Sequence, residues 1–194
     1  MTATDWEGHY QRGETGWDRG NASPALSHWL DTGSLSPCRI LIPGSGYGHE
    51  AVELARLDFN VTAVDIADSP VRHLRQKLNE LEMHADIVQA DVMNWQPQQP
   101  FDAIYEQTCL CALNPEMWPE YEQQLHRWLK PGGSLFAQFM QTGNAGGPPH
   151  HCDLLKMQEL FDDIHWQWSE DEQPLLVPHS GNRFELGFRL EHKA

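Results

Sequence analysis

A glycine-rich turn directly after a short apolar run is the feature that most limits the fold of this chain. Residues 39–42 (Arg-Ile-Leu-Ile) predict a buried strand, and residues 43–48 (Pro-Gly-Ser-Gly-Tyr-Gly) follow at once. Glycine adopts backbone conformations with positive φ and lets the main chain approach a ligand closely. A helical pattern then begins at His49. Such a strand, turn and helix predict a ligand site at the end of the first strand of an α/β sheet.

Strand-like and helix-like segments alternate along most of the chain, which predicts a mostly parallel sheet with helices on both faces. Residues 163–172 and 183–191 indicate an antiparallel pair of strands, joined by a turn that contains proline and glycine, at the end of the sheet. With them the sheet has seven predicted strands. The remaining predicted strands are 60–66, 86–90, 101–106 and 134–140, and the predicted helices are 49–57, 69–81 (capped by Ser69) and 115–129, the last ending at Lys130-Pro131-Gly132-Gly133.

The composition excludes several kinds of partner. The chain has 194 residues and a formal charge of −15 at pH 7, so we expect one domain over residues 1–194. Nucleic acid and anionic membrane surfaces repel an acidic chain, and no block of Lys or Arg offsets this charge. We expect neither a membrane span nor a signal peptide, and the four cysteines lack disulfide-scaffold or zinc-ribbon spacing. A cytoplasmic monomer or weak homo-oligomer without a metal is the expectation.

Two acidic residues stand where predicted strands end. Asp65 lies nineteen residues after Gly46, where a carboxylate can accept hydrogen bonds from both hydroxyls of a ribose. Asp91 follows the next strand, where it can meet the amino group of an adenine. The turn has the spacing G-x-G-x-G and not the G-x-G-x-x-G of dinucleotide sites. Taken alone, the turn could be only a tight turn and each acid only a helix cap.

Together these features resemble the class I S-adenosylmethionine-dependent methyltransferases. The glycine turn, Asp65, Asp91 and the Leu-Lys-Pro-Gly-Gly sequence at residues 129–133 carry the resemblance. It implies the Rossmann-like class I methyltransferase fold, with S-adenosyl-L-methionine as cofactor and S-adenosyl-L-homocysteine as product. Two alternatives stay open: a protein that binds this cofactor without catalysis, and a nicotinamide oxidoreductase, which predicts the G-x-G-x-x-G spacing.

The residue at position 42 indicates which branch of these methyltransferases the chain resembles. Most class I methyltransferases have an acid two positions before the first glycine, but this chain has Ile42 there and Glu50 after the turn. The pattern is similar to the thiopurine methyltransferase superfamily, especially its plant-type thiol/halide (thiocyanate, methyl chloride) branch. Residues 111–117 and 146–150 resemble the same branch. This resemblance implies methyl transfer to a small thiol, hydrosulfide, halide or thiocyanate, with larger aromatic thiols or selenium and tellurium oxyanions as the alternative acceptors.

The start of the chain is rich in tryptophan. Three of the eight tryptophans lie in the first thirty residues, and Trp6 and residues 16–20 resemble the aromatic leader of the family. In the family, this leader covers the bound cofactor, and we assign it to residues 1–35. A ring face attracts a sulfonium cation by ~0.5–2 kcal/mol. The leader rings could instead pack on the core, and Trp29 is assigned to packing or surface.

The resemblance places the cofactor among residues of the leader, the glycine turn and the strand ends. Gln107 is also a candidate for the reacting end, and residues 143–151 are a candidate lid in which His150 could orient a thiol or take its proton. An anionic acceptor needs little acid–base help, because its reaction with a sulfonium disperses charge. The expected cofactor-binding residues are Trp6, Tyr10, Trp17, Gly44, Gly46, Glu50, Asp65, Ile66, Asp91, Val92, Glu106 and Gln107.

Overall fold

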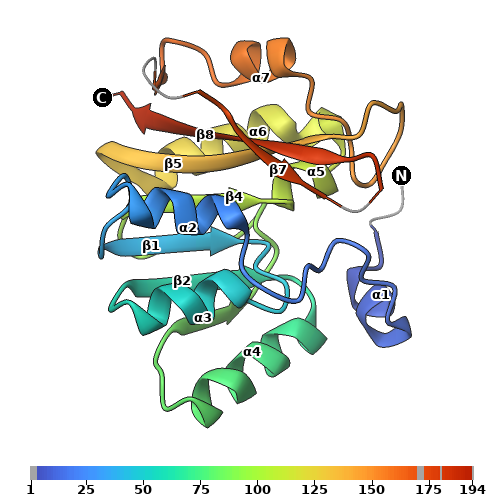
Figure 1. Ribbon diagram of the computed structural model, residues 1–194, viewed down its shortest axis with the longest axis vertical. Coiled ribbons are helices and arrows are strands. Elements are labelled where there is room, and N and C mark those ends of the chain that lie inside the picture. The colour runs from blue at the N-terminus through green and yellow to red at the C-terminus, as the bar shows by residue number, and fades with distance from the viewer. Residues whose placement is uncertain (1–3, 170–172, 180, 194) are drawn as a thin grey trace.

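The computed structural model describes residues 4–169, 173–179 and 181–193, and their strands form one eight-stranded sheet (Figure 1). The order is β3-β2-β1-β4-β5-β8-β6, and β7 pairs with β8 beside this path. The mostly parallel α/β sheet with an antiparallel C-terminal end is thus confirmed. The parallel strands are β1 (Arg39–Pro43), β2 (Asn60–Asp65), β3 (Asp86–Gln89), β4 (Phe101–Gln107) and β5 (Leu129–Gln141), and the antiparallel ones are β6 (Trp166–Trp168), β7 (Leu175–Pro178) and β8 (Phe184–His192).

Helices cover both faces of the sheet because successive strand residues point to opposite sides. In β1, Ile40 and Ile42 pack with α2 (Pro24–Asp31) and α3 (His49–Arg56), whereas Leu41 packs in the cluster of α6 (Trp118–Trp128). Figure 1 shows α2 and α3 in front of the sheet and α5 and α6 behind it. The remaining helices are α1 (Trp6–Arg12), α4 (Asp68–Glu80), α5 (Cys109–Ala112) and α7 (Leu154–Leu160).

The sheet has one strand more than the seven predicted. The additional strand, β7, falls within the segment predicted to be a turn. Prolines at positions 174 and 178 favoured a turn over a strand in the sequence. A strand that pairs on one side only tolerates proline, because its other side forms no ladder. The strand predicted at 163–172 is shorter: β6 covers Trp166–Trp168, and residues 170–172 lie outside the described residues.

The helix predicted at 115–129 also differs. A 3-10 turn covers Pro115–Met117, and α6 begins at Trp118. The helix ends at Trp128, close to the predicted end, but residues 129–133 belong to β5, which runs without interruption from Leu129 to Gln141. The pairing of β5 with β4 shifts register between Phe101 and Ala103, so the Pro-Gly-Gly segment is absorbed as an irregularity in the sheet.

The leader contains two structurally different helices. In α2, Trp29 is only 1% exposed, and its ring lies 5.0 Å from that of Phe136 in the core. In contrast, α1 lies at the edge of the sheet toward which β1 points (Figure 1). The Glu7 carboxylate of α1 accepts hydrogen bonds from Ser69 N (2.8 Å) and Ser69 Oγ (2.6 Å). The prediction that Ser69 caps this helix is therefore wrong, because α4 begins one residue earlier, at Asp68. Glu7 of the leader instead accepts hydrogen bonds from Ser69 in the first turn of α4.

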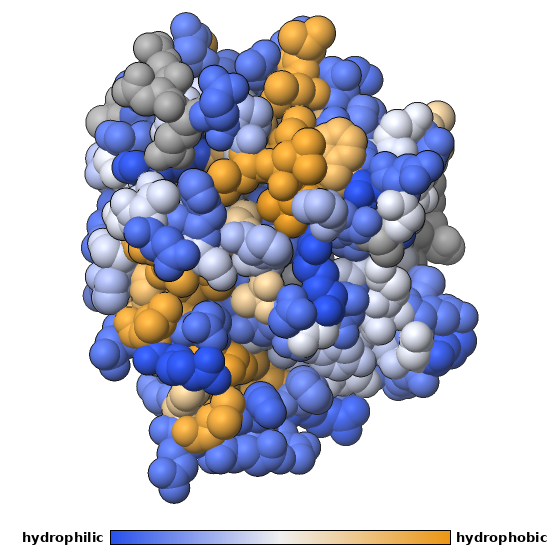
Figure 2. Space-filling view, viewed as in Figure 1, coloured by the Kyte–Doolittle hydropathy of each residue, from blue (hydrophilic) through white to orange (hydrophobic). Residues whose placement is uncertain are grey.

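The surface is mainly hydrophilic in the view of Figure 2, and hydrophobic side chains gather in a band over α7 and β7. Leu155 of α7 and Leu176 of β7 are among the most exposed large hydrophobic residues. Among the residues described, no helix has both the length and the apolar character needed to cross a membrane.

Candidate active site

A cavity of about 320 Å³ opens at the carboxyl edge of the parallel strands. The segments after β1, β2, β3 and β4 line it, together with α1 and the residues just before β8. Open α/β sheets bind their ligands at this edge. The predicted site residues that line the cavity are Trp6, Tyr10, Trp17, Gly44, Gly46, Glu50, Asp65, Ile66, Asp91, Val92 and Gln107.

The glycine turn forms the floor of the cavity and has no room for side chains. Gly44 has φ of 60°, and a Cβ atom there would lie 2.9 Å from Cys109 Sγ. Gly46 has φ of 54°, and its Cβ atom would lie 3.1 Å from the Tyr10 hydroxyl. Both the backbone conformation and the close neighbours therefore require glycine. Side chains at these positions would fill the space that a ligand needs.

Asp65 is a buried carboxylate that faces the cavity from the end of β2. Its Oδ2 accepts a hydrogen bond from Gly46 N (2.8 Å), and its Oδ1 accepts one from Ala67 N (2.9 Å). Burial raises the pKa of Asp65, while these backbone hydrogen bonds act in the opposite direction. Each oxygen of a carboxylate has a second acceptor position, so Asp65 can still accept hydrogen bonds from a diol. This donor and acceptor set fits a ribose.

Asp91 lies at the cavity edge and is held there by local hydrogen bonds. Its carboxylate accepts hydrogen bonds from Met93 N (2.9 Å) and Asn94 Nδ2 (2.7 Å), as a local cap does. Asp91 also lines the cavity beside Val92. The local hydrogen bonds hold the carboxylate at the cavity edge, where the resemblance places an adenine.

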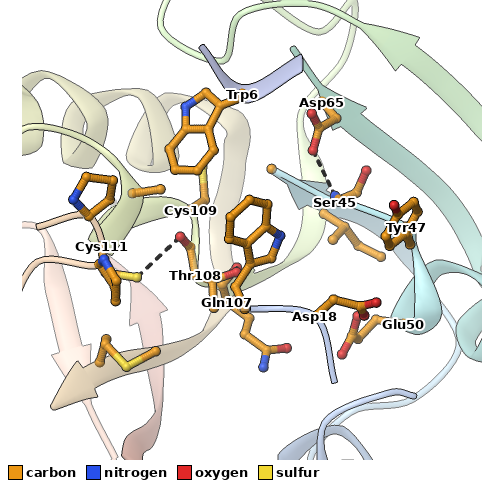
Figure 3. A pocket seen from close by; sticks show the side chains of 18 of the residues that line it. Trp6, Asp18, Ser45, Tyr47, Glu50, Asp65, Gln107, Thr108, Cys109 and Cys111 are labelled. Carbon is orange, nitrogen blue, oxygen red and sulfur yellow. Dashed lines mark hydrogen bonds between the residues drawn. The ribbon is translucent and has the colours of Figure 1, made fainter. Parts of the chain in front are cut away.

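Aromatic rings form a continuous wall of the cavity. Trp6 and Trp17 have centroids 5.4 Å apart, Tyr10 lies 5.5 Å from Trp17, and Tyr47 of the glycine turn lies 5.2 Å from Tyr10. Figure 3 shows Trp6, Tyr47 and Asp65, from three separate segments, around the same space. Such a wall fits both the flat face of an adenine and a sulfonium cation.

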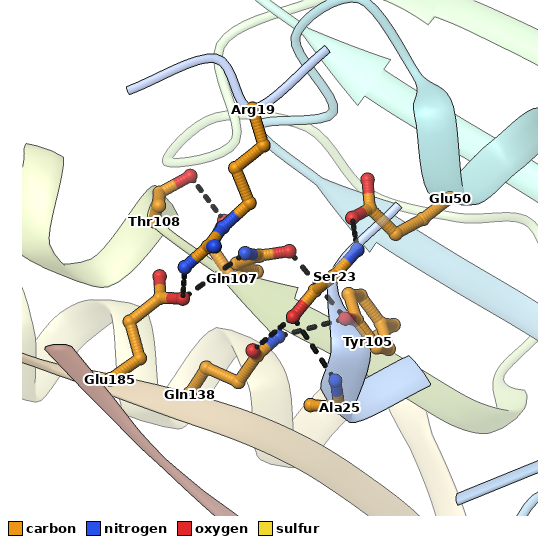
Figure 4. Close-up of polar contacts among 9 residues, drawn as sticks. All are labelled: Arg19, Ser23, Ala25, Glu50, Tyr105, Gln107, Thr108, Gln138 and Glu185. Atoms are coloured by element: carbon orange, nitrogen blue, oxygen red, sulfur yellow. Dashed lines mark hydrogen bonds and ion pairs between the residues drawn. The ribbon is translucent and has the colours of Figure 1, made fainter. Parts of the chain in front are cut away.

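A buried polar network connects the leader to the sheet below the cavity (Figure 4). Glu50 accepts a hydrogen bond from Ser23 N (2.9 Å), and Ser23 Oγ donates to Gln138 Oε1 (2.7 Å). Gln138 Nε2 in turn donates to the Tyr105 hydroxyl (2.8 Å). Burial raises the pKa of Glu50. The network fixes the segment between α1 and α2 on β4 and β5.

An ion pair continues this network to β8. Arg19 Nη2 lies 3.0 Å from Glu185 Oε2, and Gln107 Nε2 donates to the same oxygen at 3.3 Å. Glu185 is fully buried, and desolvation raises its pKa to about 7 in spite of Arg19. A further contact, of 2.8 Å between Asp18 Oδ1 and His49 Nε2, joins the leader to α3. The leader is thus held by polar contacts on both sides of the cavity.

Two predicted residues do not line this cavity. Successive side chains of a strand point to opposite faces, so Gln107 faces the cavity and Glu106 faces away from it. The Glu106 carboxylate lies under α5 and accepts a hydrogen bond from Leu110 N (2.7 Å). His150 lies at a second hollow with residues 143–146, and its backbone N–H donates to the backbone carbonyl of Cys111 (2.7 Å). The residues of the predicted lid that do line the cavity are Pro148 and Pro149.

Several cavity residues had no role in the prediction from sequence. Arg183 and His179 flank the turn before β8, where His179 N donates to Arg183 O (2.9 Å). They reach the cavity because β8 runs antiparallel to β5, which brings the start of β8 to the carboxyl edge. The predicted antiparallel pair of strands already implied that residues before the last strand lie at this edge. The other cavity residues without a predicted role include His9, Asp18, Arg19, Asn21 and Thr108.

Two cysteines line the cavity as neutral thiols. Cys109 and Cys111 lie in α5 directly after β4, and both are buried. Burial raises the pKa of each thiol well above its usual value. Within the described ranges, no group of three or more His, Cys, Asp or Glu residues is placed to hold a metal ion.

The fold is that of class I S-adenosylmethionine-dependent methyltransferases. Among solved structures, the chain is similar to the 1,6-didemethyltoxoflavin-N1-methyltransferase of Burkholderia thailandensis, which has 1,6-didemethyltoxoflavin and S-adenosylhomocysteine bound. The TM-score is 0.79 at 18% identity, over 98% of this chain and 86% of that one. The cavity described above lies at the edge of the sheet where this class of fold binds ligands.

The sequence comparisons identify the family. The family model for thiopurine S-methyltransferase matches residues 1–189. The chain is 32% identical to thiocyanate methyltransferase 1 of Arabidopsis thaliana, over 94% of this chain and 82% of that protein. It is also 32% identical to probable thiol methyltransferase 2 of the same plant, over 80% of this chain and 70% of that protein. The chain belongs to the thiopurine S-methyltransferase family, and it is an S-adenosylmethionine-dependent methyltransferase.

Proposed function

We propose that this methyltransferase acts on a small nucleophile: a thiol, hydrosulfide, halide or thiocyanate. The observation that carries the proposal is the volume of the cavity. Pockets for drug-sized ligands range over roughly 300–1,000 Å³, and this cavity of about 320 Å³ is at the lower end. A nucleoside joined to an amino acid takes up most of such a space. What is left beside it suits an acceptor of a few atoms.

Residues of this chain can hold each part of the cofactor. Asp65 and Asp91 would bind the ribose and the adenine, and the glycine turn would let the backbone approach the cofactor closely. Trp6, Tyr10 and Trp17, in and just after α1, would cover it, whereas α2 of the leader packs in the core. Bound S-adenosylmethionine supplies an electrophilic methyl group with S-adenosylhomocysteine as the leaving group.

The other end of the cavity suits an in-line displacement by an anion. Met140, Pro148 and Pro149 are apolar residues that line the cavity near the end of β5. An anion and a cation combine into neutral products more readily in a dry site than in water, because water stabilises the separate charges. The Cys109 and Cys111 thiols stay protonated, so they compete poorly with the acceptor for a methyl group.

A comparison of acceptors by size tests this proposal. The purified protein and S-adenosylmethionine are incubated with hydrosulfide, methanethiol, iodide or a thiopurine, and the methylated products are quantified. We expect the volatile methylated product from at least one small acceptor, with kcat/KM at least about 10-fold above that for the bicyclic thiol. A preference for the thiopurine would favour the larger aromatic thiols considered from sequence. No product from the small acceptors would contradict the proposal.

A further inference from the structure

The side-chain amide of Gln107 is held at both of its ends. Its Nε2 donates a hydrogen bond to Glu185 Oε2 at 3.3 Å, and its Oε1 accepts one from the Tyr105 hydroxyl at 3.5 Å (Figure 4). Gln107 lines the cavity, and its partner Glu185 is paired in the sheet with Met140, which lines the acceptor end. The fold therefore fixes the direction of a polar group beside the space left for the acceptor.

Glu185 determines which end of the amide faces β8. Its side chain is fully buried and does not line the cavity. An ionised carboxylate only accepts hydrogen bonds, so the nitrogen of Gln107, and not its oxygen, must face Glu185. Arg19 Nη2 lies 3.0 Å from the same carboxylate oxygen and supplies the opposite charge. Burial raises the pKa of Glu185 to about 7, so the carboxylate is mostly ionised at about pH 8.

A chain of hydrogen bonds that starts in the leader selects the same direction from the other side. Ser23 Oγ donates to Gln138 Oε1 (2.7 Å), so the nitrogen of Gln138 faces Tyr105 and donates to its hydroxyl oxygen (2.8 Å). The hydroxyl proton of Tyr105 is then available for Gln107 Oε1. Both neighbours of the Gln107 amide therefore require its nitrogen toward β8 and its oxygen toward Tyr105.

This direction leaves an N–H group of Gln107 for a ligand. An amide nitrogen has two N–H groups, and Glu185 accepts a hydrogen bond from one of them. The second is a donor that Gln107 can offer to a molecule in the cavity. A hydrogen bond to an anion is stronger than one between neutral groups. In the opposite direction, the amide oxygen would face an anionic acceptor and repel it.

We propose that Gln107 donates a hydrogen bond to the methyl acceptor and that Glu185 is the positioning residue that directs the Gln107 amide to this contact. Glu185 acts through Gln107, and Arg19 of the leader acts through Glu185 as its counter-ion. The acceptor contact therefore depends on the leader, although it is made by a residue of β4. The inference rests on the proposed function, because it takes the acceptor to be a small anionic nucleophile.

A double-mutant cycle tests the positioning role, with thiocyanate as the acceptor at about pH 8. We expect Gln107→Met, which keeps an unbranched side chain, to raise the KM for thiocyanate about 10-fold or more, the factor that one charge-assisted hydrogen bond contributes. Glu185→Gln should raise this KM in the parent protein but not in Gln107→Met, because it acts through Gln107. Glu191→Gln, the same substitution at an exposed position of β8, is the control and should leave the KM unchanged.

Two outcomes of the cycle would contradict the positioning role. If Glu185 only holds the leader in place, Glu185→Gln raises the KM by the same factor in the parent protein and in Gln107→Met. If Glu185→Gln lowers the KM, the released Arg19 is the group that binds the anion, and Gln107 is not.

A binding measurement separates this inference from the proposed function, and it does not depend on the folding of the Glu185 variant. In the isotope-labelled complex with S-adenosylhomocysteine, thiocyanate should shift the side-chain amide NMR signals of Gln107, identified as the pair that is absent from Gln107→Met. If thiocyanate shifts these signals but is not methylated, the contact stands and the proposed acceptor is wrong. If the signals do not shift, the contact is contradicted, and methylation of thiocyanate alone decides the proposed function.

Discussion

At the scale of single residues, two buried glutamates stand out. Burial raises the pKa of Glu106 and of Glu185 to about 7, and one carboxylate oxygen of each has no hydrogen-bond partner among the described residues. The folded state therefore holds protons that the unfolded state, with a pKa of 4.5 for glutamate, releases. Their contribution to stability is present below about pH 4.5 and is lost as the pH rises through about 7.

Glu106→Gln should remove one of these contributions. The amide oxygen can still accept the hydrogen bond from Leu110 N, but the side chain no longer ionises. We expect the free energy of unfolding of the variant, relative to the parent, to increase between about pH 5 and pH 8 by up to about 3 kcal/mol. Urea unfolding at a series of pH values measures this difference. A difference that does not depend on pH would show that Glu106 is ionised throughout.

The sequence predicted the strand ends that line the cavity but not the direction of each side chain. Asp65, Asp91 and the glycine turn line the cavity. Their place at strand ends could be predicted, because an apolar run precedes each of them in the sequence. Glu106 and Gln107 were both predicted to reach the cofactor, and the alternation of the strand separates them. A choice between neighbours in a strand needs the register of the sheet, which depends on pairing with distant segments.

At the scale of elements, the leader has two parts with different surroundings. Helix α2 packs between β7 and the central strands, whereas α1 has only seven residues and docks on α4 through Glu7 and Ser69. A helix of that length has little stability in isolation. Its structure therefore depends on tertiary contacts, which is why the tryptophan-rich sequence could be linked to a cover but not divided into these two helices.

Matched substitutions in the two helices should separate stability from binding. Trp29→Ala should lower the free energy of unfolding by about 3–5 kcal/mol, because it leaves a cavity in the core. Trp6→Ala should change the stability much less but weaken S-adenosylmethionine binding roughly 2- to 30-fold, the range of a cation–π contact. Urea unfolding and isothermal titration calorimetry measure the two effects. Equal losses of stability in both variants would contradict the division of the leader.

At the scale of the whole molecule, the alternation of strands and helices was sufficient to predict the sheet. Strand β7 was not predicted, because it contains a proline that is tolerated where a strand pairs on one side only. The early start of β5 was not predicted either, because its Pro-Gly-Gly segment lies at a register shift in the pairing with β4. The charge of −15 describes the average surface, yet the antiparallel course of β8 brings Arg183 to the cavity. A composition cannot show where a single charged side chain lies, because its position is set by chain segments that meet only in the fold.

The most direct test of the account is a single turnover with S-adenosylmethionine that carries an isotopically labelled methyl group, with hydrosulfide and thiocyanate as acceptors. The labelled volatile product and S-adenosylhomocysteine are both quantified by mass spectrometry. If the enzyme methylates these acceptors, the label should leave in the small product, in a ratio of about one to one with S-adenosylhomocysteine. Formation of S-adenosylhomocysteine without the labelled product, or no reaction with either acceptor, would contradict it.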